Sequence, residues 1–377
     1  MFVEITNTPR DYAWGSATAI AGLLGTAPSG GPEAELWLGA HPGSPARVVG
    51  EDRTLLDVVE GRLPFLLKVL AAAAPLSLQA HPTPAQAEEG FARENAAGVP
   101  LDAPNRNYKD AFHKPELIYA LSDPFRALSG FRPVAETREV LAPVAGDPRI
   151  APLVARLTGD AALREVFAWL IRGGEDVDDL VDAVVEASAT VDGPSWQTVR
   201  TLADHYPGDP GIAISLLLHT VELHPGEVLY LPAGNIHAYL EGLGIELMAS
   251  SDNVLRGGLT PKHVDVPELL SVLDFRPSPA PYLAPEEPEP GVRVFRPDVP
   301  DFVLTEVEAS AAARGVEVRL DGPAIVLCTD GAVAFEGGPS VARGQAVYVA
   351  DEQWLGIRGV GTVFVASSGR LSASSSL

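Results

Sequence analysis

Short apolar runs separated by proline and alanine dominate the first third of the chain. Residues 63–70 (LPFLLKVL), 75–80 (PLSLQA) and 114–122 (KPELIYALS) have the length and composition of β-strands. Between the second and third run, Thr83 can cap a helix and Gln86 stands where a capping box needs it. The pattern therefore predicts two strands, a helix that begins after the cap, and a third strand.

Residues 134–207 follow a different period. Apolar residues recur at helical spacing in DAALREVFAWLI and DVDDLVDAVVEAS. Strand-like sequence returns at residues 211–223 (GIAISLLLHTVEL). The pattern predicts a helical domain over residues 134–207, inserted into a β-domain that is formed by residues 1–133 and 208–275.

The last hundred residues begin with a proline-rich acidic linker, residues 276–291. After it, short apolar runs alternate with glycine turns at a spacing of roughly 8–12 residues, which is typical of a β-sandwich or jelly roll. Residues 276–377 are therefore predicted to form a second β-domain that ends in a flexible tail at residues 369–377. The expected fold class is mainly β with a helical insertion.

Composition narrows the classes of function. The formal net charge of −23 disfavours nucleic acid and anionic membrane surfaces as partners. The only cysteine, Cys328, excludes a disulfide framework and leaves little room for a cysteine-based zinc site. The N-terminus lacks the apolar segment of a signal peptide, and no apolar run is long enough to cross a bilayer. We therefore expect a soluble cytoplasmic protein.

Residues with metal-ligand chemistry stand in three of the predicted strands. Gln79 and His81 are two residues apart, so both side chains would project from one face of a strand. Glu116 and His237 follow in two other strands, and a set of nitrogen and oxygen donors suits Zn²⁺ or another first-row divalent ion. The same residues also fit ordinary polar positions at strand ends, so the metal site depends on the fold bringing them together.

Cations and carboxylates flank these positions. Lys114 would point the same way as the glutamate two residues on; a nearby metal would favour its neutral form and make it a candidate proton shuttle. The alternative is a surface ion pair. Arg256 and Lys262 flank a Gly-Gly pair and suit a phosphate or an enediolate oxygen, although a glycine turn with solvated charges fits too. Glu246 and Asp252 are either partners of this site or ordinary polar residues.

The other histidines show weaker signals. His41, His205 and His224 lie beside proline or glycine, and His263 follows a lysine, so we expect all four to be surface or structural residues. A glycine-rich phosphate loop, a GxSxG elbow and an HExxH motif do not occur.

Three segments in a fixed order resemble the type I mannose-6-phosphate isomerases. They are residues 76–82 (LSLQAHP), 113–121 (HKPELIYAL) and the PAGNIHAYLEG…SDNVLRGGLTPKH stretch at 232–263. YAWGS, ELWLGAHPGSPARV and PFLLKVL extend the resemblance over about the first 275 residues. The resemblance implies two cupin-type jelly-roll domains and an inserted helical domain. Because no histidine follows His263, the C-terminal jelly roll cannot repeat the metal site.

The resemblance also assigns roles to individual residues. It implies one zinc ion held by Gln79, His81, Glu116 and His237. It implies proton transfer or direct substrate contact for Lys114 and Arg256, with Glu246 as a proton relay. Three residues are expected to contact the phosphate of the substrate: Lys68, Ser77 and Lys262. Tyr239 and Asp252 are expected to contact other parts of the substrate.

The implied activity is the interconversion of D-mannose 6-phosphate and D-fructose 6-phosphate through a cis-enediol(ate), in a monomer. Two other interpretations stay open, namely a cupin oxygenase that uses Fe²⁺ and a sugar-binding cupin without catalysis. Arg256 and Lys262 favour a phosphorylated substrate over an apolar one. Lys114 beside the metal position argues for catalysis.

Overall fold

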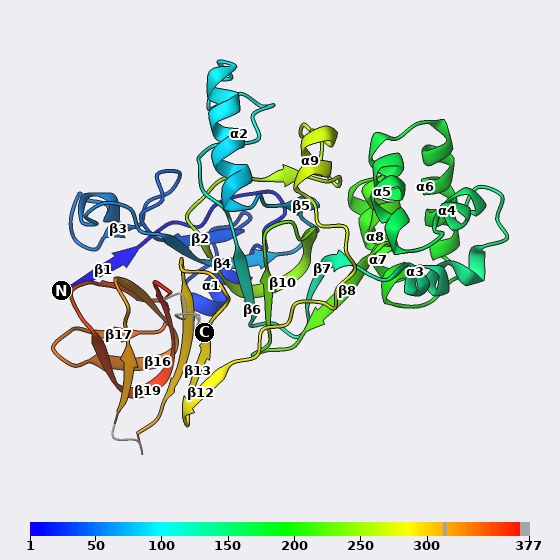
Figure 1. Ribbon diagram of the computed structural model, residues 1–377. Coiled ribbons are helices and arrows are strands. Elements are labelled where there is room, and N and C mark those ends of the chain that lie inside the picture. The colour runs from blue at the N-terminus through cyan, green and yellow to red at the C-terminus, as the bar shows by residue number, and fades with distance from the viewer. Residues whose placement is uncertain (312–314, 370–377) are drawn as a thin grey trace, which may run out of the picture.

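Two large antiparallel sheets form most of the structure, a computed structural model that describes residues 1–311 and 315–369 (Figure 1). One sheet has nine strands and the other has ten. Helices gather at the side of the nine-stranded sheet that lies away from the ten-stranded one. The predicted class, mainly β with helices, is confirmed. None of the described helices has the length and apolar character that crossing a membrane requires.

The nine-stranded sheet is built around one long strand, β10, which pairs with β4, β5, β6 and β7. Its strands are β2 (Glu35–Leu38), β4 (Phe65–Ala72), β5 (Gln79–Ala80), β6 (Glu116–Ala120), β7 (Phe125–Phe131), β8 (Leu218–Leu223), β9 (Val228–Leu231), β10 (His237–Ala249) and β11 (Leu255–Arg256). A bulge between Tyr239 and Glu241 divides β10. The first half pairs with β5 and β7, and the second half pairs with β4 and β6.

This division places site residues on two cross-strand rows. In the first half of β10, His237 lies opposite Gln79, which in turn lies opposite Arg256 on β11. In the second half, Glu246 lies opposite Lys68 on β4, and that lysine lies opposite Trp37 on β2. Since side chains of directly opposed residues stand on the same face of a sheet, each row forms a band of neighbouring side chains.

The predicted strand at residues 75–80 is wrong for most of its length, because only Gln79–Ala80 forms a strand. The preceding residues run as irregular backbone that bonds to two partners. Leu76 N–H donates to the carbonyl of Tyr239, and Leu78 N–H donates to that of Gly258. An apolar run without strict alternation does not distinguish such a buried connection from a strand.

The ten-stranded sheet combines the C-terminal strands with two from the N-terminal region. Its strands are β1 (Phe2–Thr6), β3 (Arg47–Val48), β12 (Glu286–Glu289), β13 (Val292–Phe295), β14 (Val303–Ala309), β15 (Val316–Arg319), β16 (Ala324–Phe335), β17 (Ser340–Ala342), β18 (Ala346–Val349) and β19 (Trp354–Ser367). The predicted series of short C-terminal strands is confirmed. Unexpectedly, β1 pairs with β18, so the chain begins in the sheet in which it ends. The end of the predicted linker forms β12, and the predicted tail lies outside the described residues from residue 370 on.

The helical segment forms as predicted and continues beyond its expected end. Its helices are α3 (Val134–Leu141), α4 (Ala151–Arg156), α5 (Leu163–Arg172), α6 (Glu175–Ser188), α7 (Pro194–His205) and α8 (Gly211–Ser215), with 3₁₀ turns at Ala142–Val144 and Asp160–Ala162. The strand predicted for residues 211–223 is wrong in its first part, where α8 forms. Every residue from 211 to 218 is buried. A run that is apolar on all sides shows neither a helical nor a strand period, so packing against α5, α6 and α7 decides its conformation.

Two helices and a loop lie above the nine-stranded sheet (Figure 1). The helices are α2 (Pro84–Ala96) and α9 (Val266–Val272). Helix α1 (Ala19–Leu24) lies against β4, and a 3₁₀ turn forms at Leu55–Asp57. The capping box predicted at Thr83 and Gln86 is present. Tyr108, in the loop after α2, is fully buried and donates a 2.6 Å hydrogen bond to Glu268 of α9, which ties the loop to both helices.

Gly90 in the middle of α2 provides a test of this packing. A methyl group there would come within 2.3 Å of the Tyr108 ring. Alanine favours a helix over glycine by about 1 kcal/mol, but overpacking a core costs about 1–3 kcal/mol, so we expect Gly90→Ala to lower the melting temperature. Gly22→Ala in α1 is the matched control, because nothing lies within 4 Å of its added methyl group. Calorimetry should show no loss for the control; equal or higher stability of Gly90→Ala would contradict the packing.

Candidate functional site

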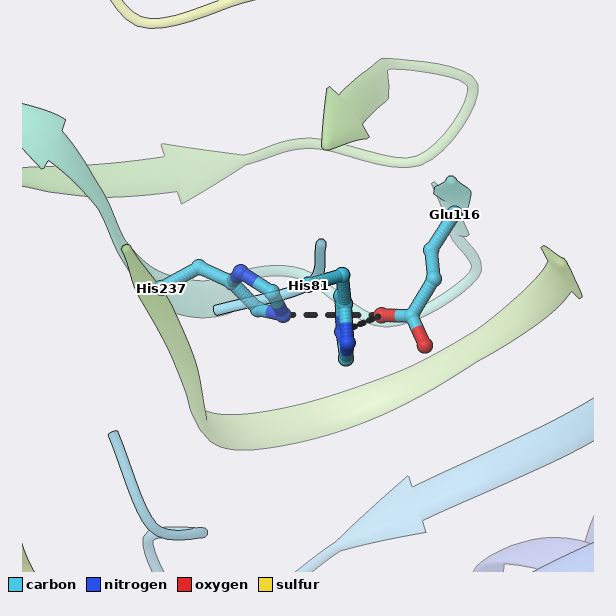
Figure 2. A group of neighbouring side chains, drawn as sticks. All are labelled: His81, Glu116 and His237. Carbon is cyan, nitrogen blue, oxygen red and sulfur yellow. Dashed lines mark ion pairs between the residues drawn. The ribbon is translucent and has the colours of Figure 1, made fainter. Parts of the chain in front are cut away.

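Two histidines and a glutamate converge at one point inside the nine-stranded sheet (Figure 2). The Nε2 atoms of His81 and His237 lie 3.4 and 3.5 Å from Oε2 of Glu116. Each residue offers one ligand atom, and these three atoms all lie within 4.8 Å of one another. All three side chains are buried. The segments that carry them are far apart in the sequence, so the fold brings together three of the four predicted metal ligands.

The orientation of both rings is set by backbone carbonyls. Nδ1 of His81 lies 2.8 Å from the carbonyl oxygen of Asn253, and Nδ1 of His237 lies 3.1 Å from that of Asn235. A carbonyl only accepts, so each Nδ1 carries the proton and each Nε2 turns a lone pair toward the centre. Such outer hydrogen bonds orient the histidine ligands of metal sites.

The centre contains acceptors without donors. Nε2 of His81 and Oε2 of Glu116 are buried and make no hydrogen bond to any described residue. Leaving such groups unpaired in a protein interior is costly, and a cation between them removes the cost. Two imidazole nitrogens and a carboxylate oxygen are the donor set that zinc binds in proteins, so the residues fit a divalent metal ion.

Gln79, the fourth predicted ligand, lies next to this cluster. Its amide nitrogen is 3.3 Å from Nε2 of His237. Amide nitrogen and oxygen exchange places by a half-turn of the amide, so the same side chain reaches the centre with its oxygen. The arrangement is compatible with Gln79 as a fourth, weaker ligand.

Charges and burial around the cluster keep both ligand types in their metal-binding forms. Burial alone would raise the pKa of the Glu116 carboxyl, but Lys114, His81 and His237 together hold it well below its ordinary value. Nζ of Lys114 lies 2.5 Å from Oε1 of Glu116. Burial lowers the pKa of His81 to about 4, so that ring is neutral at pH 7. Deprotonated carboxylate and neutral imidazole are the forms that bind metals.

A second buried cluster occupies the row of Lys68 and Glu246. Nζ of Lys68 lies 2.9 Å from Glu246 Oε2 and 3.9 Å from Glu35 Oε1. Trp37 Nε1 donates a 2.7 Å hydrogen bond to the other oxygen of Glu35. Burial opposes the charge on Lys68, but the carboxylates of Glu246 and Glu35 raise its pKa above its ordinary value, and so the ammonium is held between them.

Burial raises the pKa of Glu246 despite its lysine partner. The hydroxyl of Tyr239 is also buried near this carboxylate, and burial followed by the charges of Glu246 and Glu116 raises the pKa of the hydroxyl well above its ordinary value. A carboxyl with a raised pKa and a phenol that keeps its proton thus lie near each other in the interior.

Arg256, Lys262 and Lys109 form a group of cations at the β11 side. Burial lowers the pKa of the Arg256 guanidinium. Burial and then the charge of Arg256 lower the pKa of Lys262. Among the described residues, no carboxylate lies within ion-pair distance of Arg256 or Lys262. A half-buried arginine and an exposed lysine without such counter-charges form a suitable place for an anion.

Four of the 27 basic residues of the chain are lysines, and all four lie in these clusters. Lys68 and Lys114 flank the acids of the interior, while Lys109 and Lys262 flank Arg256. No lysine occurs anywhere else in the sequence. We did not use this signal in predicting the site, although it would have indicated Lys109. Lys109 donates to the carbonyls of Leu101 and Ala103 in the loop after α2.

The remaining candidates lie at the edge of the site. Ser77 is half-buried in the segment before β5. Asp252 is half-exposed, and its neighbour in space is His41. His41 was expected to be a surface or structural residue; it is buried, with Nε2 3.3 Å from Asp252 Oδ2. Glu35 was missed as well. Both missed residues stand in ELWLGAH, where a charged and a titratable residue interrupt an apolar run.

Comparison with known proteins gives consistent matches. Residues 2–134 match the family model described as the catalytic domain of type I phosphomannose isomerase. The mannose-6-phosphate isomerase of Escherichia coli (strain K12) is 40% identical over 384 residues, covering 95% of this chain and 97% of that protein. The Bos taurus protein of the same name is 35% identical and covers 86% of each. A crystal structure of mannose 6-phosphate isomerase bound with zinc and yttrium matches with a TM-score of 0.90 at 37% identity, over 98% of this chain and 100% of that one.

The buried ring of His81 makes the stability of the metal-free protein depend on pH. Its pKa is about 4 in the folded chain, against an ordinary value of 6.5. Between these values the unfolded chain binds the extra proton, so this contribution to stability is complete above pH 6.5 and is lost as the pH falls toward 4. From pH 7 to pH 5 we expect the free energy of unfolding to fall by about 2 kcal/mol in urea titrations. His81→Gln cannot titrate there and should lose less; equal losses in both proteins would refute the assignment.

Proposed function

The chain belongs to the type I mannose-6-phosphate isomerase family, and we propose that it interconverts D-mannose 6-phosphate and D-fructose 6-phosphate with the help of one zinc ion. The observation that carries the proposal is the buried pair of unpartnered acceptors, His81 Nε2 and Glu116 Oε2. Beside this pair lies a second feature, the cations Arg256 and Lys262 without counter-charges. The first feature fits a divalent metal, and the second fits a phosphorylated substrate.

Four side chains would hold the zinc ion: Gln79, His81, Glu116 and His237. When bound there, the ion supplies a Lewis acid that stabilises negative charge on the substrate oxygens near C1 and C2. Nδ1 of each histidine is committed to a backbone carbonyl, so neither ring has to reorient before it binds metal.

The reaction removes a proton from C2 of the open-chain aldose, moves a hydroxyl proton from O2 to O1, and returns a proton to C1. The intermediate is an enediol(ate), and its formation requires a base and donors near the two oxygens. We assign the exchange of the oxygen-bound protons to Lys114 and Arg256, with Glu246 as a relay. Burial raises the pKa of Glu246, and this brings the carboxyl closer to the range in which it can both take up and release a proton.

We propose that Arg256, Lys262 and Ser77 contact the phosphate. A guanidinium binds two phosphate oxygens at once, and an ammonium adds a point charge. Lys68 was expected in the same role, but its engagement with Glu246 and Glu35 favours a different one, which is to hold the relay carboxylate in place. Tyr239 and Asp252 are proposed to contact the hydroxyl groups of the sugar.

We also propose that the two sheets are cupin-type jelly rolls. The domain boundaries follow the sequence prediction, with residues 1–133 and 208–275 as the catalytic domain, 134–207 as the helical domain and 276–377 as the second jelly roll. Strands β1 and β3 are exceptions, since both belong to the ten-stranded sheet, and α8 extends the helical segment to Ser215. We expect the protein to be a monomer in the cytoplasm.

Zinc should be necessary for activity. A chelator should abolish the isomerisation of mannose 6-phosphate in a coupled assay, and added zinc should restore it. Glu116→Gln keeps the size of the side chain but removes its charge, and we expect it to lose zinc and at least about 100-fold in rate, since even the loss of an outer partner costs 10–100-fold. Glu88→Gln, on the exposed face of α2, is the control. Full activity in zinc-free Glu116→Gln would refute the proposal, and oxygen uptake without isomerisation would favour the oxygenase.

Lys262 provides a test of the phosphate site. Lys262→Met should raise KM for mannose 6-phosphate by about 10-fold with little change in kcat, because a charge-assisted hydrogen bond to a distant phosphate is made equally in the ground and transition states. Lys262→Arg keeps the charge and should lose less. The control reaction is any residual turnover of unphosphorylated mannose. Its rate should be the same in Lys262→Met as in the wild-type protein. An equal loss for both sugars would contradict the assignment.

A further inference from the structure

We infer that His41 is a positioning residue that fixes the carboxylate of Asp252 toward the substrate. The inference rests on the proposed isomerase function. Nε2 of His41 lies 3.3 Å from Oδ2 of Asp252, and the imidazole is buried whereas 53% of the aspartate side chain is exposed. A buried ring thus lies against a carboxylate that is open to solvent.

The neighbouring turn determines which nitrogen of His41 carries the proton. The backbone N–H of Gly43 donates a 3.1 Å hydrogen bond to Nδ1 of the ring. A nitrogen that accepts a hydrogen bond has no proton of its own, so in the neutral imidazole the proton sits on Nε2, the nitrogen that lies 3.3 Å from Oδ2 of Asp252. Glycine permits this contact, since a methyl group at Gly43 would lie 3.2 Å from Nδ1.

Packing prevents the ring from turning away. Trp37 meets His41 edge to face, with ring centroids 5.0 Å apart. Trp37 is itself held by its 2.7 Å hydrogen bond to Glu35. The chain of contacts therefore runs from the Lys68 row through Trp37 to His41 and ends at the carboxylate of Asp252.

The carboxylate of Asp252 is the group proposed above to contact the hydroxyl groups of the sugar. Burial opposes its charge, but His41, Lys114 and Lys68 together lower the pKa of Asp252, so all three cations or donors act on the same group. Its backbone N–H is tied to Asp110 Oδ2 at 2.9 Å. With Oδ2 engaged by His41, Oδ1 makes no hydrogen bond to any other described residue and is left to accept one from a sugar hydroxyl.

A purely structural role accounts poorly for these contacts. A buried histidine that only supports a fold gains little from bonding a half-exposed carboxylate, because exposed pairs contribute little to stability. The His41 contact has its effect by holding the Asp252 carboxylate in the orientation that accepts a hydrogen bond from a substrate hydroxyl. A site whose supporting groups are loose loses catalytic efficiency.

The test compares two polar replacements of similar character. The amide nitrogen of glutamine reaches about as far as Nε2 of histidine, whereas that of asparagine matches Nδ1 and falls short of Asp252. We expect His41→Gln to keep kcat/KM for mannose 6-phosphate within about threefold of wild type, and His41→Asn to lose about tenfold or more. Zinc content and melting temperature should stay similar in both. If His41→Asn fails to fold, His41→Phe replaces it as the variant without a donor near Asp252.

A double-mutant cycle separates positioning from other effects. Asp252→Asn should cost more than His41→Asn, and the combined variant should be no slower than Asp252→Asn alone beyond about twofold, because His41 acts through Asp252. Additive losses would overturn the inference, and so would wild-type kinetics of His41→Asn.

A measurement independent of turnover gives a further check. The ¹⁵N spectrum of imidazole-labelled protein should show His41 with its proton on Nε2, identified by the signal that disappears in His41→Asn, and Asp252→Asn should shift that signal. A proton on Nδ1 would overturn the inference. Inactive wild-type protein with bound zinc would instead show that the proposed function, and not the His41 contact, is wrong.

Discussion

The structure depends on two buried acceptors that face each other without a donor between them. His81 Nε2 and Glu116 Oε2 lie 3.4 Å apart, and neither is solvated or hydrogen-bonded. A protein interior tolerates such a pair only when a cation joins it or a proton is shared. Burial keeps the imidazole neutral, and Lys114 helps to keep the carboxylate charged, so the electrostatics of the pocket favour a metal ion over a proton. The donor set of the cluster therefore fits a divalent metal ion.

Strand β10 gives this centre its geometry. The strand has thirteen residues and changes partners at its bulge. Its first half presents His237 to Gln79 and Arg256, and its second half presents Glu246 to Lys68. One continuous strand thus connects the proposed metal ligands, the proposed anion site and the carboxylate that we propose as a relay. Because the alternation of side chains has a period of two, a register shift of one residue would remove both rows from the interior.

The charge distribution matches a small anionic substrate in a strongly acidic protein. The net charge of −23 repels anions at long range. The four lysines and Arg256 act against this field at short range, and screening by salt is weak for the two buried lysines, Lys68 and Lys114. Lysine is used only here, and arginine supplies the other basic residues of the chain. We interpret this as retention of the ammonium where a compact, titratable cation is needed.

The sequence by itself determined the helical insertion, the short C-terminal strands, the capping box of α2 and the residue types of the metal site. These follow from local periodicity and from donor chemistry, both of which are written in short stretches of chain. Only the tertiary structure decided that β1 joins the last strands, that residues 211–215 form a helix, and that Lys68 is held between two carboxylates. It also decided that His41 contacts Asp252. The physical reason is that each of these depends on which distant segment lies alongside, and a residue surrounded by apolar neighbours carries no local mark of the partner it will meet.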